Sequence, residues 1–593
     1  MKRFIMAGLA AVTLALSPLT AMPAQAAEAQ PVFAAERQAN EGRRAERQRF
    51  IHTTEQAIVF TFGGLSKRGA LEDVLDKMDA EEMRGTFFVT ERELKRNKDN
   101  IALIAARGHE LAIGLRVSQD KEKPDDFDSL CAQITRIRTA LKEEYGVETD
   151  LVREMFGSNE DFMFEAVSAM GCRLIGQSVN VVRTKDKEAQ SAEEIMPTLF
   201  GKGVTSLGRG QIVYIRTDFY DREALAGEMM LAVKHAKIDN IAYRSIEDTP
   251  ELNPKNDSAY RVEALGTVLG NQEKCYTYPV ALDKLPQDLQ PGTVDRPVSR
   301  ENLKAEFLQR YIGSPSVDGS DRMLGFSASE IAKADKTGVI NNVPQGTVFL
   351  TFDDWGNDDA VNKLLYVLRK HHAPATFFVI TWNMPNNPNL LRAIAQDGHD
   401  IGSHTDGHKA MSRYNPKTRR NEPVLDKDAY AKDVADSYEK LALTVGDVVI
   451  DGRHPLTRLM RPPTLALNKS GVQAIFDAGF TYIVSGFAST TDYKAPLLTS
   501  MVGAIQSGIY DGKNQVRTGS VIVMHMTSNA KYTARALDIL LTENEKRADN
   551  DPLKFRPALL STYLVPGYEQ LSGTKGRMKT KPKAPLTLTD TRH

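Results

Sequence analysis

Several features that would define a protein class are scarce or missing in this chain. Its 593 residues include only three cysteines, and none of them forms a CxxC pair that could hold zinc through thiolates. Lysine plus arginine (76) nearly balances aspartate plus glutamate (77), so charge gives no sign of a nucleic-acid or anionic-membrane partner. No later apolar run approaches the roughly 20 residues of a membrane span. We therefore expect a protein without nucleic-acid partners and without a membrane span.

The first residues have the pattern of an export signal. Lys2 and Arg3 precede the apolar run 4–16, and Ala24-Gln25-Ala26 has the small-x-small form of a cleavage site. This pattern predicts a signal peptide over residues 1–26 and a periplasmic or secreted mature protein.

An oxidising compartment would permit a disulfide between Cys131 and Cys172, with Cys275 left over. Three isolated buried thiols are equally compatible with the sequence. The pairing stays open at this point.

The chain contains the same pattern twice. Segments of the second half repeat segments of the first at a constant spacing of 290 residues: Thr351-Phe352-Asp353-Asp354 repeats Thr61-Phe62-Gly63-Gly64, Thr376-Phe377-Phe378-Val379 repeats Thr86-Phe87-Phe88-Val89, and Gly398-His399 repeats Gly108-His109. Further along, the spacing is 308 residues from Arg153 to Arg461. The second copy therefore has about 18 extra residues, which we place in the polar stretch 411–427.

Strands and helices alternate along each copy. In the second, the apolar run 348–352 reads as a strand, and Val361, Leu364, Leu365 and Leu368 then follow a helical period of 3.6 residues. A strand over 375–380, a helix over 389–396 and a strand over 399–404 come next. Such alternation is typical of parallel strands covered by helices. We expect an α/β protein with two distorted (β/α) barrels in tandem, joined by a structured connector.

These patterns divide the chain into six segments. We expect a signal peptide (1–26), a polar leader (27–54), a first barrel without activity (55–249), a connector (250–344) with a helix near 300–311, a second barrel with the chemistry (345–570) and a disordered tail (571–593).

Ionisable residues gather in the second copy. Asp353 and Asp354 end a predicted strand, and His404 and His408 have the i, i+4 spacing that lets two imidazoles share one metal ion. Either pair alone is more often a solvated turn or a surface pair. Together they make a three-ligand site for zinc, with one carboxylate left to act as a base.

The motifs of the second copy resemble those of a known family. Five motifs appear in the family's order: Thr351-Phe352-Asp353-Asp354, His404-Thr405-Asp406-Gly407-His408, Arg461-Pro462-Pro463, Asp492-Tyr493 and Val523-Met524-His525. This set resembles the polysaccharide deacetylases, the NodB-homology enzymes of carbohydrate esterase family 4. The likeness covers roughly residues 340–565, and a degenerate form of it covers roughly 55–245.

The resemblance implies a role for each motif residue. Asp354, His404 and His408 would hold the metal, Asp353 would be the general base oriented by Arg461, and His525 would be the general acid held by Asp492. The backbone N–H near Thr464 would stabilise the oxyanion, and Tyr493 and Val523 would line the acetyl pocket. The ligand types indicate Zn²⁺, with Co²⁺ or Ni²⁺ as substitutes.

The sequence departs from the family pattern at three positions. Thr464 stands where an aromatic residue is usual, Tyr493 where tryptophan is usual, and Met526 where an acidic residue is common. We expect the first departure to widen the cleft or to alter a sugar subsite.

The first copy lacks these groups. Gly63 and Gly64 replace the two carboxylates, Gly114 and Ser118 stand at the histidine positions, and Arg216 stands where His525 would be. We expect this copy to bind no catalytic metal.

We interpret other positions that the two copies share as structural. Arg153 persists, with Phe156 at the position of Thr464. His399 recurs as His109 in the copy without catalytic groups, so we interpret it as structural, and we interpret His371, His372 and His454 as surface or structural residues.

The sequence thus predicts an exported, metal-dependent deacetylase that removes N-acetyl groups from GlcNAc-type units of a polysaccharide, either peptidoglycan or an exopolysaccharide. An O-acetyl glycan esterase using the same site, a non-catalytic glycan-binding protein and a hydrolase of small amides are the alternatives. The sequence indicates no oligomeric state.

Overall fold

A computed structural model describes residues 33–118, 120, 122, 124–245, 258–316, 322–423, 426–570 and 577–578. The predicted signal peptide and nearly all of the predicted tail lie outside these residues. No helix in the described part of the chain is long and apolar enough to cross a membrane.

The first half forms one sheet with the strand order β1-β6-β5-β4-β3-β2-β8-β7, and β9 also pairs with β2. All of its pairings are parallel. The strands are β1 (Arg47–Gln48), β2 (Ala57–Gly63), β3 (Thr86–Val89), β4 (Glu110–Leu115), β5 (Leu151–Glu154), β6 (Arg173–Ile175), β7 (Val179–Asn180), β8 (Ile212–Arg216) and β9 (Arg261–Glu263).

The second half forms a sheet with the order β10-β19-β17-β14-β13-β12-β21-β20, and β22 also pairs with β12. Its strands are β10 (Tyr311–Ile312), β12 (Thr347–Asp354), β13 (Ala375–Val379), β14 (Asp400–Ser403), β17 (Leu456–Met460), β19 (Tyr482–Val484), β20 (Ala488–Ser489), β21 (Ser520–His525) and β22 (Arg556–Pro557). Replacing each strand of the first sheet by its counterpart in the repeat gives this order. The prediction of two tandem (β/α) barrels is confirmed.

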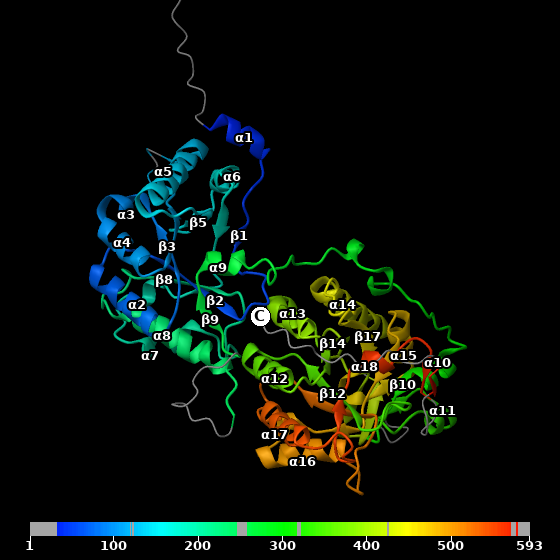
Figure 1. Cartoon of the computed structure of the whole chain (residues 1–593). Helices are drawn as coiled ribbons and strands as arrows, with labels where there is room; N and C mark the ends of the chain where they lie inside the picture. Colours follow the sequence, from blue (N-terminus) through cyan, green and yellow to red (C-terminus); the bar gives the residue numbers. More distant parts are fainter. Residues whose placement is uncertain are drawn as a thin grey trace, which may run out of the picture.

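Most helices cover the outside of both sheets (Figure 1), whereas α9 (Leu265–Gly270) and α18 (Leu560–Tyr563) pack in apolar clusters with residues of the inner faces. In the first half they are α1 (Ala34–Asn40), α2 (Arg68–Ala80), α3 (Glu91–Arg96), α4 (Lys98–Ala106), α5 (Phe127–Tyr145), α6 (Asp161–Ala169), α7 (Ala192–Leu199), α8 (Leu225–Lys237) and α9 (Leu265–Gly270). In the second half they are α10 (Leu303–Arg310), α11 (Ala328–Lys333), α12 (Asp358–Lys370), α13 (Pro388–Gln396), α14 (Lys427–Val445), α15 (Lys469–Asp477), α16 (Leu498–Ile509), α17 (Thr533–Glu545) and α18 (Leu560–Tyr563).

The alternation of side chains along β12 explains where the polar residues lie. Val348, Leu350 and Phe352 pack with the helices in the larger apolar cluster of the second half. Phe349 belongs instead to a smaller cluster that contains strand residues and α18 but none of the covering helices. Because successive side chains of a strand point to opposite faces, Thr351 and Asp353 share the inner face with Phe349. The inner face is thus apolar at one end and polar at the end where the strands stop.

Two predicted segments turn out to be parts of the sheets. The segment predicted as a polar leader supplies α1 and β1, which pairs with β6 at the edge of the first sheet. Its end is buried at Ile51, Thr53 and Thr54. The predicted connector is structured, as expected, but it is divided between the halves: β9 joins the first sheet and β10 joins the second. The expected helix appears as α10.

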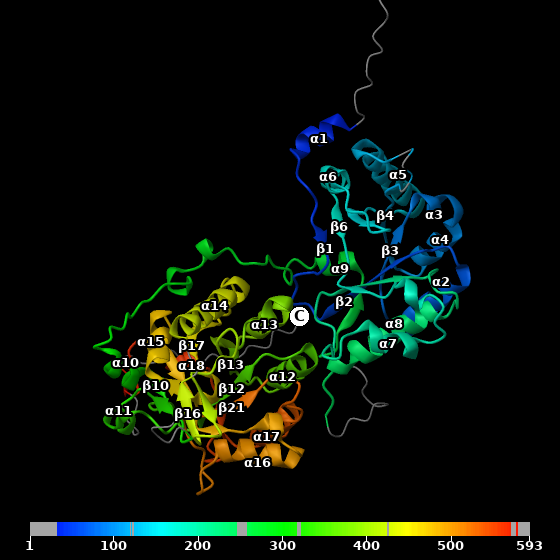
Figure 2. The same cartoon turned by 180° about the vertical axis from the view of Figure 1, so that it is seen from behind.

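Part of the extra sequence of the second copy forms a hairpin. β15 (Ser412–Asn415) pairs antiparallel with β16 (Arg420–Pro423), and these two strands form a sheet of their own. Figure 2 labels β16. The hairpin lies within the stretch 411–427 where we placed the insertion, but the region between His408 and α14 holds only ten of the 18 extra residues. The other eight lie between the end of α14 and Arg461, so the predicted place is right only in part.

The remaining short strands form two small sheets. β11 (Met323–Leu324) pairs with β18 (Leu467–Asn468), and β23 (Tyr568–Glu569) pairs with β24 (Arg577–Met578) inside the predicted disordered tail. The cysteines are free: Cys131 and Cys172 are buried, and Cys275 is half-buried. The structure therefore has buried thiols rather than the Cys131–Cys172 bridge.

The two halves meet through α12 and α13 of the second (Figure 1). Arg209 of the first half donates from Nη2 to Oδ1 of Asn362 on α12 at 2.7 Å. Asn389 on α13 donates to the carbonyl oxygens of Ile51 and Arg209 at 2.8 and 2.7 Å. These side chains are buried. The first half is thus packed directly against two helices of the half that carries the predicted chemistry.

Candidate active site

The predicted chemical groups meet at the carboxyl ends of the second sheet's strands. Asp353 of β12 lies opposite His525 of β21 in the parallel register. His404 directly follows β14, and Arg461 directly follows β17. Parallel strands end at the same edge of a sheet, so groups far apart in the sequence become neighbours there.

Three side chains form a cluster that could hold a metal ion: Asp354, His404 and His408. Oδ1 of Asp354 lies 3.7 Å from Nε2 of His404 and 3.6 Å from Nε2 of His408. Two donors bound tetrahedrally at about 2.1 Å from a zinc ion would lie roughly 3.4 Å apart, so these spacings fit one ion. Two imidazoles and one carboxylate also match the donor set of open zinc sites.

The backbone turns Asp354 toward this cluster. Its φ is 78°, in the left-handed region, so the chain leaves the strand where simple alternation would point this side chain away from Asp353. The counterpart in the first half, Gly64, has nearly the same φ of 71°.

A hydrogen bond sets the orientation of His404. Its Nδ1 lies 2.7 Å from the carbonyl oxygen of Arg461, which only a protonated Nδ1 can satisfy. This tautomer leaves Nε2 as a lone pair facing Asp354. Burial lowers the pKa of His404, against the opposing charges of Asp353 and Asp354, and so favours the neutral ring that a metal needs.

Asp353 is buried beside the cluster and paired with Arg461. Nη1 of Arg461 donates to Oδ1 of Asp353 at 2.6 Å and to the hydroxyl of Thr351 at 2.8 Å. Oδ2 of Asp353 lies 4.0 Å from Nε2 of His404. Burial alone would raise the pKa of Asp353, but the charges of Arg461, His404 and His525 outweigh it and lower the pKa. Asp353 is thus held as a carboxylate at the edge of the cluster.

Arg461 is itself fixed on every side. Its remaining donors reach the carbonyl oxygens of Val484 at 3.0 Å and Ser485 at 2.7 Å. Its guanidinium lies 4.2 Å from the ring centroid of Phe378. The Arg461 side chain is completely buried. Its fixed guanidinium therefore fixes the oxygen of Asp353 to which it donates.

His525 is paired with Asp492 on the other side of Asp353. Nδ1 of His525 lies 2.6 Å from Oδ1 of Asp492, and the His525 backbone N–H donates to Oδ2 at 2.8 Å. The hydroxyl of Thr533 also donates to Oδ2 at 2.8 Å. Burial lowers the pKa of His525, but the hydrogen bond to Asp492 and the charge of Asp353 outweigh it, so the pKa is raised. The ring is therefore disposed to carry a proton.

The three predicted pocket residues differ in position. The Tyr493 ring packs edge-on against His525, with centroids 4.8 Å apart, and remains 40% exposed. Val523 is buried two positions before His525 on the same face of β21. Thr464 is exposed, with φ 60°, and its carbonyl accepts from the Arg322 guanidinium. No contact among the described residues joins Thr464 to the cluster, so its predicted role stays a prediction.

Sequence reasoning missed Trp382. Its backbone N–H donates to the carbonyl of Asp406, inside the loop from His404 to His408, at 3.0 Å. Its side chain is 64% exposed, so a large aromatic surface lies at the rim of the cluster. The available signal was a tryptophan two residues after the predicted strand 375–380, in the kind of loop where binding residues gather.

Side chains fill the corresponding place in the first half. A Cβ added at Gly64 would lie 1.9 Å from Oδ1 of Asp218, which pairs with Nη2 of Arg216 at 2.9 Å. A Cβ at Gly63 would lie 2.3 Å from Cε of Met155. Among the described residues, no group of metal-ligating side chains lies at this edge.

Arg153, the counterpart of Arg461, has other partners. It donates to the carbonyl of Gly176 at 2.9 Å and to Oε1 of Gln177 at 2.6 Å, and it lies 3.6 Å from the ring centroid of Tyr214. Without a carboxylate at Gly63, this arginine only braces the strand ends.

The described residues contain a second acidic and histidine cluster, formed by Glu81, His235 and Asp239. The Lys234 ammonium occupies it, with Nζ 2.9 Å from carboxylate oxygens of both Glu81 and Asp239. An internal cation therefore already neutralises these carboxylates.

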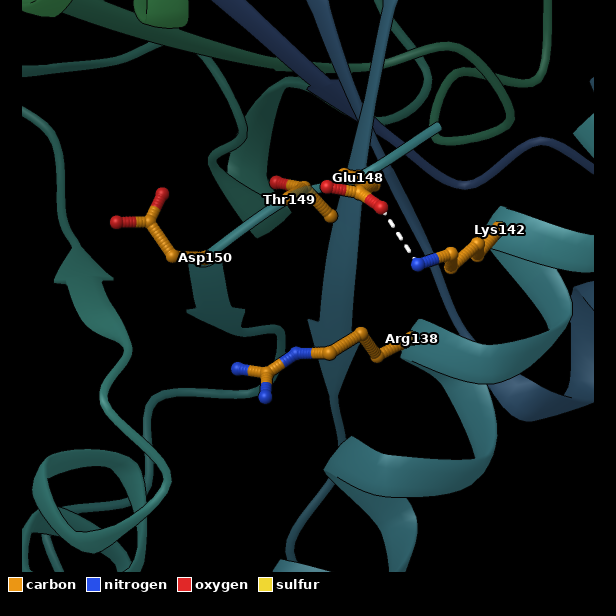
Figure 3. Close-up of a pocket in the computed structure, with 5 residues that line it drawn as sticks. All are labelled: Arg138, Lys142, Glu148, Thr149 and Asp150. Atoms are coloured by element: carbon orange, nitrogen blue, oxygen red, sulfur yellow. Dashed lines mark ion pairs between the residues drawn. The ribbon is translucent and has the colours of Figure 1, made fainter. Parts of the chain in front are cut away.

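A surface cavity of about 480 Å³ lies at the amino-terminal end of β5, far along the chain from the cluster. Arg138, Lys142, Glu148, Thr149 and Asp150 line it (Figure 3). Its charges are largely paired: Lys142 with Glu148 at 2.6 Å, and Asp150 with Arg173 at 2.9 Å. This cavity offers no group of the kind that the predicted chemistry requires.

The fold is a (β/α) barrel, and its candidate site combines three side chains that could hold a metal ion with a buried carboxylate. The polysaccharide deacetylase family model matches residues 51–175 and 340–483, in the same parts of both halves. The two matched segments belong to the polysaccharide deacetylase family.

Curated relatives agree with this family. The chain is 27% identical over 202 residues to a peptidoglycan-N-acetylglucosamine deacetylase of Bacillus cereus, covering 34% of this chain and 82% of the relative. A second protein of that name and organism is 39% identical over 198 residues, covering 33% of this chain and 62% of the relative. The chitooligosaccharide deacetylase of a Bradyrhizobium species is 43% identical over 70 residues, covering 12% of this chain and 32% of the relative. The last two matches span less than two thirds of each relative's length.

Proposed function

We propose that the second half is a metal-dependent hydrolase that removes N-acetyl groups from GlcNAc-type units of a polysaccharide. Water and the acetamide are consumed, and the free amine and acetate are released. The observation that carries this proposal is the cluster of Asp354, His404 and His408 with the buried carboxylate of Asp353 at its edge. Names of relatives that act on peptidoglycan and chitooligosaccharides support an N-acetylated sugar polymer.

The donor set of the cluster suits Zn²⁺, and Co²⁺ or Ni²⁺ could substitute. A divalent ion held there would polarise the acetyl carbonyl and increase the acidity of water. Asp354, His404 and His408 would hold the ion.

Asp353 would then act as the general base. It is held as a carboxylate by Arg461 and can accept a proton from the attacking water. Because Arg461 donates to only one of its oxygens, Oδ2 is available on the side of His404.

His525 would act as the general acid. An amine anion is a very poor leaving group, so the nitrogen must receive a proton as the C–N bond breaks. The hydrogen bond to Asp492 and the charge of Asp353 raise the pKa of His525 against the effect of burial, which favours the protonated ring that this role needs. A proton transfer of this kind contributes about 10²–10⁴-fold to the rate.

The direct test is acetate release from N-acetylated chitooligosaccharides and from peptidoglycan glycan strands, measured by mass spectrometry. Asp353→Asn removes the base with little change in shape and should lower kcat by about 10²–10⁴-fold while zinc remains bound at one ion per chain. His408→Ala should lose the zinc. Full activity of the Asn variant would show that Asp353 is not the base.

Acetylated xylan serves as the competing substrate. Acetate release from xylan but not from chitooligosaccharides would favour an O-acetyl esterase that uses the same groups. Absence of stoichiometric zinc would favour a glycan-binding protein. We also propose that the protein acts after export, as the predicted signal peptide over residues 1–26 indicates.

A further inference from the structure

The β15–β16 hairpin distinguishes the second half from the first. In the first half, only eight residues separate Ser118 from helix α5, and four of them are acidic while two are lysines. In the second half, the chain between His408 and helix α14 is longer and forms the hairpin. The insertion therefore accompanies the candidate active site and differs in charge from its counterpart.

Exposed cations cover the hairpin. Arg413, Lys417, Arg419 and Arg420 are all exposed, and no ion pair or side-chain hydrogen bond joins them to any residue that the structure describes. The only acidic residue of the hairpin, Glu422, accepts instead from Asn415 at 2.8 Å and Thr418 at 2.7 Å.

This local excess of positive charge stands out in a chain whose net charge is −1. Elsewhere, exposed arginines commonly lie beside carboxylates, as Arg68 does beside Glu72 and Arg136 beside Glu91. Charged residues also protect exposed strand edges from pairing with other chains. Glu422, opposite Arg413 in the register, is the one carboxylate of the hairpin against these four cations. The remaining excess of positive charge is more than such protection needs, and it suits a ligand that brings its own negative charge.

The base of the hairpin lies at the rim of the candidate active site. Ser412 is the fourth residue after His408, a span of at most about 14 Å. Met411 is buried, and its sulfur accepts from the backbone N–H of Asn468 at 3.1 Å, in the segment that follows Arg461 and Thr464. The backbone N–H of Lys409 donates to the Thr405 hydroxyl at 3.1 Å, inside the loop from His404 to His408. The hairpin is therefore anchored between two loops of the site.

The hairpin also carries an exposed aromatic ring, on the face opposite to Arg413 and Arg420. Tyr414 is 55% exposed and pairs across the hairpin with Asn421. A tyrosine ring offers an apolar face and a polar tip, which suits a sugar ring. The planar guanidinium of arginine matches a carboxylate in geometry and charge, because it can donate two parallel hydrogen bonds.

We propose that the hairpin 412–423 binds the acidic units of an anionic polysaccharide whose acetylated unit occupies the cluster of Asp354, His404 and His408. The ligand class is a glycan in which sugars that bear carboxylates flank the N-acetylated sugar. This inference rests on the proposed function. Nucleic acid is a less suitable ligand for two reasons. The cations are confined to the hairpin beside the proposed hydrolytic site, and the composition of the whole chain has no excess of basic residues.

The test compares two acetylated substrates of equal length. One is a neutral chitooligosaccharide, and the other is a peptide-free peptidoglycan glycan strand, in which every second sugar bears a lactyl carboxylate. The variant Arg413→Gln/Arg419→Gln/Arg420→Gln removes three hairpin cations. The matched control, Arg92→Gln/Lys95→Gln/Arg96→Gln, removes three exposed cations around helix α3 of the first half.

We expect the hairpin variant to lower kcat/KM on the acidic strand by about tenfold at low salt and to leave kcat/KM on the neutral substrate within twofold. The control should change neither. Added salt should remove the wild-type advantage on the acidic strand, because mobile ions screen exposed charges. Equal activity of wild type and variant on the acidic strand, or an equal loss on both substrates, would overturn the proposal.

A binding measurement separates this proposal from the proposed function. In the Asp353→Asn background, the acidic strand should bind about tenfold more weakly when the three arginines are replaced. If wild-type protein releases no acetate from any substrate while this difference persists, the proposed function fails and the hairpin assignment stands. If a DNA oligonucleotide of equal charge competes as well as the glycan, the hairpin is a general polyanion surface and the assignment fails.

Discussion

Left-handed backbone conformations gather around the metal cluster. Asp354, Thr405 and His408 have φ values of 78°, 65° and 53°. Such conformations are unfavourable for residues that carry a Cβ, and they persist only where the surrounding structure imposes them. The first half adopts the conformation of Asp354 with a glycine, Gly64, and thus without this cost. The candidate metal ligands of the second half are therefore held in place at some cost in folding stability.

This comparison gives a prediction at Asp354. Asp354→Gly should abolish zinc binding and raise the free energy of unfolding of the metal-free protein by about 1 kcal/mol, because glycine accepts a positive φ without strain. Asp354→Ala is the matched control: it also removes the ligand but keeps the Cβ. Denaturant unfolding in the presence of a chelator, with zinc binding followed by calorimetry, would measure both effects. An alanine variant as stable as the glycine variant would contradict the role of backbone strain.

How far the sequence predicts the site depends on the residue. The sequence predicts the cluster because ionisable residues directly follow predicted strands with a spacing that suits metal ligands. These residues are Asp353, Asp354, His404 and His408. Trp382 could not, because a single exposed aromatic has no periodicity, and only its backbone bond to Asp406 brings it to the rim. The position of Thr464 could not be predicted from the sequence either, because its left-handed conformation depends on the loop around it.

At the scale of elements, the repeat explains two buried histidines. His109 and His399 each directly precede an inner strand, β4 and β14, and each packs against a phenylalanine, with ring centroids 5.4 Å apart in both halves. Both rings are buried. His399 therefore has a structural place that does not depend on the metal cluster.

These histidines make stability depend on pH. Burial lowers the pKa of both rings to about 4, against an ordinary value of 6.5. The unfolded chain takes up these protons first as pH falls, so stability is complete above pH 6.5 and is lost between about 6.5 and 4. Each histidine should contribute a loss of about 3 kcal/mol across this window.

His399→Phe tests this contribution. The ring is kept and the titrating group is removed, so the fall in unfolding free energy between pH 6.5 and 4 should become smaller by about 3 kcal/mol. His372→Phe, at a position outside the buried sites, serves as control. An unchanged pH profile in the His399 variant would show that this imidazole does not titrate as its burial implies.

Element assignments show why other parts were harder to predict. The strands and helices of the second barrel follow clear periods, so β13, α13 and β14 lie where the sequence placed them. β1 was missed because two residues, Arg47 and Gln48, have no apolar alternation and become a strand only by pairing with β6. β9 and β10 were likewise hidden in the connector, because their partners are distant in the sequence.

At the scale of the whole molecule, a buried polar network joins the halves. Arg209 donates to the Tyr260 hydroxyl and to the carbonyl of Thr54, both at 2.9 Å, and to Asn362 of α12. Tyr260 donates in turn to Asp358, the first residue of α12, at 2.5 Å. Helix α12 begins four residues after Asp354, so the first half fixes the helix that follows the candidate metal ligand.

Composition and periodicity gave no sign of this network. Its members are single polar residues spread from Thr54 to Asn389, and each would be expected at the surface if its own half were considered alone. Only the docking of the two barrels buries them. We infer that the first half persists without catalytic groups because the second half needs it as a structural support.

Arg209→Met tests that interpretation. The change fills a similar volume but leaves Asp358 buried without its nearby cation, and loss of one partner from a buried charged network costs about 3–5 kcal/mol. We therefore expect a lower unfolding midpoint in denaturant for the full-length protein, and acetate release should be lost at a lower temperature than in the wild type. Arg209→Met/Asp358→Leu removes both charges and should recover most of the stability, since replacement of a buried pair by apolar residues is often neutral. Additive losses in the double variant would mean that the two residues do not act together, and that the first barrel stabilises α12 by another route.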